Sequence, residues 1–170
     1  WAHENGKTTF KVPAGTYLVA KGSKDADPDA RINMVPNMTF WLDDKAIIKK
    51  ETNGYEIYHT MYLGVGVNNV TIKGGTYEGD RETHNYSVKG PNTAGTHEWG
   101  SGIEIAGAKN VVIEGTTIQK FTGDGISVGG LTIAGSYLTD KYLESGSLEQ
   151  NGKPIDQKGK IRTVGRTQTN

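Results

Sequence analysis

The chain has 170 residues, of which only 34% are hydrophobic and 24 are glycine, so one ordinary domain with a thin core and many tight corners is expected. Its 19 basic and 19 acidic residues balance, which gives no electrostatic case for a nucleic-acid or membrane-surface partner. The absence of cysteine excludes a disulfide framework and a thiolate zinc site.

The first twenty residues predict the end of a helix followed by two strands. Residues 1–6 have the pattern of a last helical turn, with Asn5-Gly6 as its terminator. Residues 8–12 and 16–19 are then predicted to be strands on either side of a turn at residues 13–15. We therefore expect an N-terminal capping helix, truncated in this sequence, that leads into strands.

Three copies of one eight-residue pattern follow, at residues 70–77, 111–118 and 131–138. Each copy is an alternating strand that meets a glycine corner, followed by a second apolar residue. Two further strands, 102–105 and 125–128, repeat at an offset of 23 residues. These spacings predict a stack of β-coils with about 20–23 residues per coil.

Asparagines precede three of the aligned strands, at Asn37, Asn69 and Asn110. They are predicted to be corner residues that form an internal ladder. The long step between the first two copies contains one polar and aromatic insert, residues 78–100. We expect the stack to cover residues 1–140, and residues 141–170 to be a polar linker or the start of a further domain.

Several strings resemble the pectate-lyase-like right-handed parallel β-helix superfamily. They are VPAGTY at residues 12–17, NVTIKG at 69–74 and GDGISV at 123–128. Within that superfamily the chain is most similar to tail and tailspike-type proteins of phages and prophages of Gram-positive bacteria. The resemblance implies an all-β fold, a right-handed parallel β-helix that is a single-stranded solenoid behind the truncated capping helix. It also implies a virion (phage tail) or extracellular location. For the full-length protein, a homotrimer is consistent with the same resemblance.

Four carboxylates are predicted to converge on one face of the stack. Asp80 and Glu98 begin and end the insert, Glu104 points outward from the strand that follows, and Asp124 precedes a glycine on the next coil. Two carboxylates suit a glycoside hydrolase, as acid and base or nucleophile. Each also has a structural interpretation, as a turn residue, a loop ion pair or a solvated strand charge.

Four further residues are predicted to bind the substrate. Trp99 would provide a stacking platform, with His97 beside it, while Arg81 and Lys120 would hold an anionic sugar group. The histidines lack the spacing of a metal motif, so no metal site is predicted. Calcium is expected only if the chain is a lyase.

The sequence therefore predicts a phage or prophage tail-type protein that binds and depolymerises a bacterial surface polysaccharide, by glycoside hydrolase or polysaccharide lyase chemistry. Two alternatives stay open. One is a non-catalytic β-helix stalk or glycan-binding module, which the lack of a complete glycosidase signature favours. The other is a secreted uronan lyase or epimerase.

Overall fold

The structure, a computed structural model, describes residues 1–91, 95–129, 131–133, 149–150, 153–154 and 164–166. The chain divides into two units, Trp1–Ser127 and Val128–Asn170. In the second unit β13 (Leu131–Ile133) pairs antiparallel with β16 (Val164–Arg166), and β14 (Glu149–Gln150) pairs with β15 (Lys153–Pro154). The predicted domain boundary at residues 140 and 141 lies outside the described residues.

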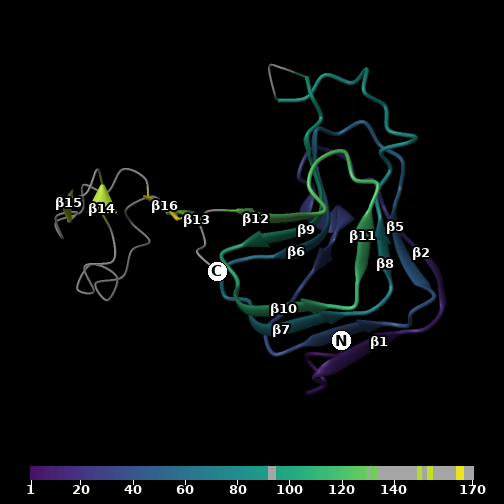
Figure 1. Cartoon of the computed structure of the whole chain (residues 1–170), viewed down its shortest axis with the longest axis vertical. Helices are drawn as coiled ribbons and strands as arrows, with labels where there is room; N and C mark the ends of the chain where they lie inside the picture. The colour runs from purple at the N-terminus through teal and green to yellow at the C-terminus, as the bar shows by residue number, and fades with distance from the viewer. Residues whose placement is uncertain (92–94, 130, 134–148, 151–152, 155–163, 167–170) are drawn as a thin grey trace. The chain divides into compact units, whose positions relative to one another are not determined.

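The strands from β1 to β12 form three parallel sheets of four strands each (Figure 1). Their orders are β1-β4-β7-β10, β11-β8-β5-β2 and β12-β9-β6-β3, which we call sheets A, B and C. The chain visits the three sheets in the same rotation each time, so three consecutive strands make one circuit. The bounds are β1 Thr9–Val12, β2 Gly15–Val19, β3 Ile32–Asn33, β4 Thr39–Leu42, β5 Ala46–Lys50, β6 Ile57–Leu63, β7 Asn68–Lys73, β8 Thr76–Glu78, β9 Trp99–Ala106, β10 Lys109–Glu114, β11 Thr117–Gln119 and β12 Ile126–Gly129.

This architecture corrects the predicted fold. The described chain is all-β, but the expected right-handed parallel β-helix, a single-stranded solenoid, is wrong because every circuit gives one strand to each of three separate sheets. The capping helix is also wrong. Residues 2–6 form turns, closed by a hydrogen bond from Lys7 N–H to the Ala2 carbonyl (2.9 Å). Among the described residues the only helical segment is the short 3-10 turn Pro28–Ala30.

Strand register confirms the predicted 23-residue step from 102–105 to 125–128, because Gly102 N–H donates to Asp124 O and Ile103 N–H donates to Gly125 O. It corrects the predicted coil length for the other circuits. Phe10 pairs with Phe40, Phe40 with Ile72, and Ile72 with Ile113, at offsets of 30, 32 and 41 residues. The predicted coil length was based partly on the 20-residue step from the second copy of the repeat (111–118) to the third (131–138). That copy begins with β13, which pairs antiparallel in the second unit, and residues 134–138 lie outside the described residues. The 20-residue step therefore does not measure a circuit.

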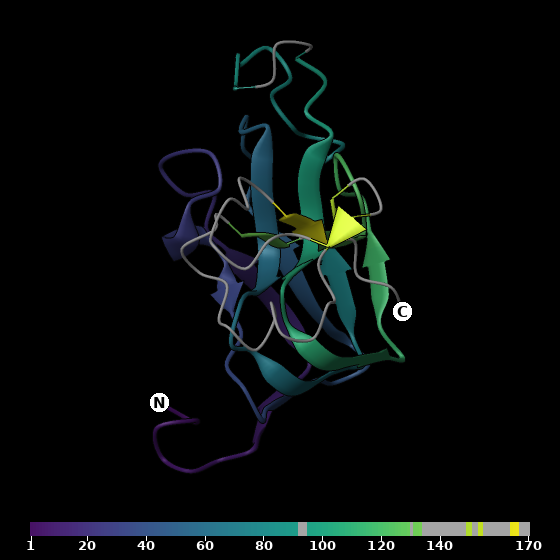
Figure 2. The ribbon, with the colours of Figure 1, turned by 90° about the vertical axis from the view of Figure 1, so that its left-hand side faces the viewer.

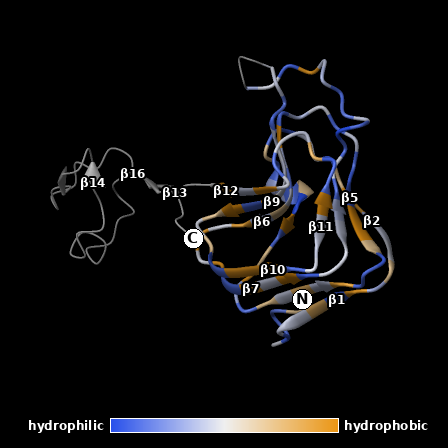
Figure 3. Ribbon diagram, in the orientation of Figure 1, coloured by the Kyte–Doolittle hydropathy of each residue, from blue (hydrophilic) through white to orange (hydrophobic). Residues whose placement is uncertain are grey.

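Inward side chains of the three sheets form the apolar core of the first unit, and Figure 3 shows the hydrophobic residues along these strands. Leu42, Ile72 and Tyr77 have no exposed surface. The corner between β7 and β8 depends on Gly75, whose φ is +61°. A Cβ atom there would lie 2.5 Å from Leu42 Cβ, so the close approach of neighbouring circuits requires glycine.

One connection between sheets B and C is much longer than its neighbours. The chain passes from β5 to β6 through residues 51–56 and from β11 to β12 through 120–125, but from β8 to β9 through residues 79–98, which we call the insert. It extends beyond the ends of β6 and β9 (Figure 2). Its base is bonded to the next circuit, because Gly79 N–H donates to Gln119 O and Arg81 N–H donates to Lys120 O, both at 2.9 Å.

The predicted asparagine ladder is present, although it lies at the surface and not inside. Asn37, Asn69 and Asn110 have φ values of +58°, +54° and +52°. Asn69 Nδ2 donates to Asn37 Oδ1 (3.0 Å), and Asn110 Nδ2 donates to Asn69 Oδ1 (3.1 Å). Asparagine tolerates a left-handed backbone, and its side-chain amide both donates and accepts hydrogen bonds. One residue type therefore provides both the positive φ of the corner and the hydrogen bonds of the ladder.

Asn69→Ala should lower the free energy of unfolding by about 2 kcal/mol, because it loses the left-handed preference and the ladder hydrogen bonds. Asn69→Gly keeps the backbone preference and should lose only about 1 kcal/mol. Urea denaturation of both variants measures the difference. Equal stability of the alanine variant and the wild type would show that the ladder contributes nothing.

Candidate functional site

The candidate site lies on the outer face of sheet C, where the normal alternation of strand side chains is interrupted. In β6 the adjacent residues Thr60 and Met61 are both fully buried, so His59 and Tyr62 lie on the outer face although three positions separate them. β9 runs in register with β6, with Ser101 opposite His59 and Glu104 opposite Tyr62. The shared interruption brings polar side chains from the two strands together.

A cavity of about 220 Å³ opens on this face. Three of the four predicted catalytic carboxylates and the predicted stacking residue line it. Its lining residues are Ile57, His59, Glu98, Trp99, Ser101, Glu104, Asp124 and Ser127. Trp99 is 46% exposed, so its ring is available to a ligand. The cavity therefore combines an accessible aromatic ring with a group of carboxylates.

Glu104 is the carboxylate whose surroundings disfavour its charge. Burial raises the pKa of Glu104 above its ordinary value, and the charge of Asp124 raises it further. Hydrogen bonds from Ser127 and Ser101, and the charge of Arg31, oppose this rise in the pKa. Glu104 thus holds its proton more tightly than an exposed glutamate does, as a general acid must.

His59 contributes to the cavity as a neutral group. Burial lowers the pKa of His59 to about 4, and the nearby charges of Arg31 and Lys50 lower it in the same direction. Its Nδ1 atom lies 2.7 Å from Ser101 Oγ and 4.0 Å from Glu104 Oε2. The Glu104 contact is therefore no ion pair at neutral pH. Because serine and glutamate approach the same ring nitrogen, the three residues do not form a Ser–His–acid triad.

A cation lies beside the acidic cavity. The Arg31 guanidinium stacks on the ring of Tyr62, with 3.7 Å between its central carbon and the ring centroid, and Arg31 Nε donates to Asn33 Oδ1. Arg31 affects the pKa of both Glu104 and His59. A fixed guanidinium at this position attracts anionic groups toward the same face.

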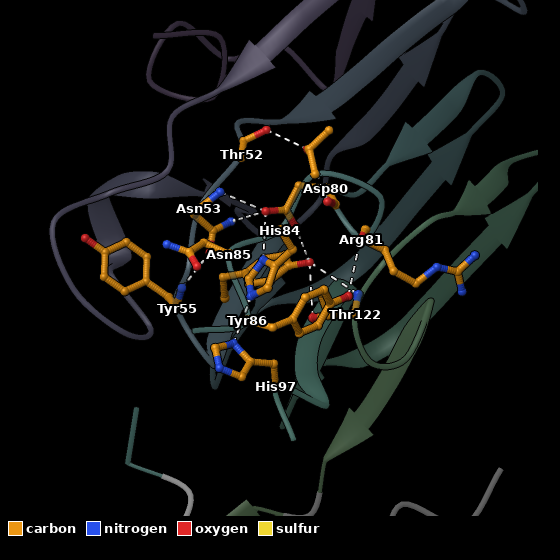
Figure 4. Close-up of polar contacts among 12 residues, drawn as sticks. Thr52, Asn53, Tyr55, Asp80, Arg81, His84, Asn85, Tyr86, His97 and Thr122 are labelled. Atoms are coloured by element: carbon orange, nitrogen blue, oxygen red, sulfur yellow. Dashed lines mark hydrogen bonds and ion pairs between the residues drawn. The ribbon is translucent and has the colours of Figure 1, made fainter. Parts of the chain in front are cut away.

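The other predicted site residues lie elsewhere. Asp80 and His97 are interior residues, 3% and 1% exposed, in the base of the insert. Lys120 forms ion pairs with Glu82 (3.2 Å) and Glu78 (3.7 Å). The Arg81 side chain points away from the polar cluster around Asp80 (Figure 4). None of these four residues lines the cavity.

Sequence reasoning missed His59, Ser101 and Ser127. His59 and Ser101 are 42 residues apart, and only the register of β6 with β9 brings them together. For Ser127 the available signal was its place between Ile126 and Val128 in the strand 125–128, which puts it on the same outward face as Glu104 of the strand 102–105.

Among the residues that the structure describes, no group of three or more histidine, aspartate or glutamate side chains is placed to hold a metal ion. In the same part of the chain no helix is long and apolar enough to cross a membrane.

Comparison with known proteins connects the chain to Bacillus. It is 35% identical over 130 residues to the SPbeta prophage-derived uncharacterized protein YorA of Bacillus subtilis, covering 74% of this chain and 22% of that protein. It is 37% identical over 149 residues to the uncharacterized protein YclG of the same organism, covering 84% of this chain and 25% of that protein. The chain thus spans about a quarter of the length of these curated relatives.

No family model and no solved structure matches the chain. The similarity to a prophage-derived protein supports the phage part of the predicted resemblance. Membership of the pectate-lyase-like superfamily has no such support.

Glu104 should titrate above its ordinary value of 4.5, and Asp124→Asn should lower its midpoint because one charge that raises its pKa is removed. Carbon-13 NMR of labelled glutamate carboxyl groups measures both midpoints. Glu114→Gln, on the exposed face of sheet A, is the matched control and should leave the Glu104 midpoint unchanged. A Glu104 midpoint at or below 4.5 would contradict the described electrostatics.

Glu104→Gln should stabilise the protein at neutral pH. A raised pKa means that the folded state binds the proton more tightly than the unfolded chain, so the free energy of unfolding falls as pH rises from 4.5 through the folded pKa. The glutamine stays neutral and avoids that loss, whereas well below pH 4.5 the two proteins should be equally stable. Chemical denaturation at both pH values measures this, and a variant less stable than wild type at neutral pH would refute it.

Proposed function

We propose that this chain is part of a phage or prophage tail-type protein that binds a bacterial surface polysaccharide and hydrolyses it in the cavity on sheet C. The observation that carries the proposal is that Glu104, with its raised pKa, lines the same cavity as Asp124 and Trp99. A carboxyl group with a raised pKa beside a second carboxylate is typical of an acid and base pair. The exposed aromatic ring supports a sugar as the ligand.

The proposed reaction uses one water molecule per bond. The Glu104 carboxylic acid donates its proton to the glycosidic oxygen as the bond from that oxygen to the anomeric carbon breaks. A water molecule attacks the anomeric carbon, and Asp124 accepts its proton. Proton exchange with solvent then restores both carboxyl groups. Glu98 and Trp99 contact the sugar from the wall that the insert provides, and Arg31 attracts its anionic groups.

The biological setting is part of the same proposal. One relative is prophage-derived, which supports a virion location, or an extracellular one, for the longer protein to which a chain of this kind belongs. A polysaccharide of the bacterial surface is the partner that such a protein meets. The balanced charge supports neither nucleic acid nor a membrane as a partner.

Glu104→Gln should lower the rate of polysaccharide cleavage by about 10²–10⁴-fold, the range for removing a general acid. The probe is a pool of Bacillus cell-wall polysaccharides, and released reducing ends measure the rate. Glu114→Gln is the matched control, because it makes the same change on a strand of sheet A far from the lining residues, and it should keep full activity.

Three results would overturn the proposed hydrolysis. Full activity of the Glu104→Gln protein would remove Glu104 from the reaction. Products with unsaturated sugars, formed only without chelator, would indicate a calcium-dependent lyase or epimerase-type enzyme. Binding of the polysaccharides without any product from the wild type would indicate a binding module or stalk.

A further inference from the structure

The insert is built on a buried carboxylate that receives four hydrogen bonds. Tyr58 donates its hydroxyl to Asp80 Oδ1 at 2.7 Å. Asp80 Oδ2 accepts from Asn53 N–H (2.8 Å), Asn53 Nδ2 (3.0 Å) and His84 Nδ1 (2.9 Å). The Asn53 amide orientation is fixed, because its Oδ1 atom accepts from Tyr55 N–H. Asp80 therefore acts only as an acceptor.

Two imidazoles continue this network through the insert (Figure 4). His84 Nε2 lies 2.9 Å from His97 Nδ1, and His97 Nε2 lies 2.9 Å from the Val88 carbonyl oxygen. The network thus runs from a carboxylate through two histidines to a carbonyl, with an acceptor at each end. The Tyr86 ring packs against both imidazoles, at centroid distances of 4.8 Å and 5.6 Å.

The number of protons in this network follows from its contacts. His84 Nδ1 must carry a proton to donate to Asp80, and His97 Nε2 must carry one to donate to Val88 O. The contact between the two rings needs a third proton, on either ring. Two neutral imidazoles carry only two protons, so without a third the two facing nitrogens would both present lone pairs at 2.9 Å.

We infer that His84 and His97 share one extra proton, and that this cationic pair, held by Asp80, positions Glu98 and Trp99 at the cavity. A cation next to the buried Asp80 carboxylate also adds to the charge compensation that Lys50 provides. The other titratable side chains in the surrounding interior are Lys50, Glu56 and Tyr58.

The chain path connects the network to the site. Asp80 begins the insert, His84 lies within it, and His97 immediately precedes Glu98 and Trp99. His97 has a left-handed φ of +53°, an unusual conformation that its two side-chain hydrogen bonds hold in place. The network therefore ties both ends of the insert to β6 through Tyr58. The link to polysaccharide cleavage rests on the proposed function, whereas the proton count does not.

The first test counts protons in the unmodified protein. Nitrogen-15 NMR of labelled histidine distinguishes protonated from unprotonated ring nitrogens, and a His3→Phe and a His59→Phe protein assign the other two histidines. At neutral pH we expect three protonated nitrogens among the four of His84 and His97. Two protonated nitrogens would overturn the inference, whatever the protein binds or cleaves.

The second test measures positioning. In protein labelled with 5-fluorotryptophan, His97→Phe should shift and broaden the Trp99 fluorine signal and lower the rate of polysaccharide cleavage by about 10²-fold. His3→Phe, in the exposed N-terminal turn, makes the same substitution and should change neither. An unchanged Trp99 signal in folded His97→Phe protein would overturn the positioning role. A shifted signal in a protein whose wild type cleaves nothing would retain that role and reject only the proposed function.

Discussion

The parallel register of β6 with β9 is the constraint on which the site depends. It sets His59 beside Ser101 and Tyr62 beside Glu104 across 42 residues of sequence. In both strands the alternation of inward and outward side chains is interrupted at paired positions. The two interruptions therefore match, and the core beneath them is not disturbed. A one-residue slip of β9 would exchange its inner and outer faces and remove Glu104 from the cavity. The backbone pairing of sheet C thus determines which side chains can meet.

Strand positions and the 23-residue step from 102–105 to 125–128 followed from local pattern, but the length of the longer circuits did not. Alternation and glycine corners predicted strands at 70–77 and 111–118, where the structure has β7, β8, β10 and β11. The asparagine ladder was predicted for the same reason, because left-handed corners have a distinctive residue preference. The length of a circuit depends instead on long-range pairing. The copy at 131–138 has the same local pattern, but its described strand β13 pairs antiparallel with β16.

The candidate site was predicted in part. Outward position along a strand, or next to one, was enough to select Glu98, Trp99, Glu104 and Asp124, which line one cavity. Asp80 and His97 occupy the same polar insert as Glu98, but they are buried there by contacts with Tyr58, Asn53 and His84. Sequence pattern does not show which polar residues of a loop fold inward, because no periodicity governs the loop.

The surroundings of Glu104 make its charged form unfavourable for stability. Its burial and the charge of Asp124 oppose ionisation and raise the pKa of Glu104, the direction that a general acid requires. The buried Asp80 carboxylate has different surroundings, because it accepts four hydrogen bonds.

The most direct measurement is a crystal structure of the Glu104→Gln protein soaked with oligosaccharides released from Bacillus cell walls. The account predicts a sugar ring against Trp99, with a glycosidic oxygen within hydrogen-bond distance of the side chain at position 104. A sugar bound instead at another surface, such as the exposed Trp41 on sheet A, would contradict the assignment of the cavity as the site.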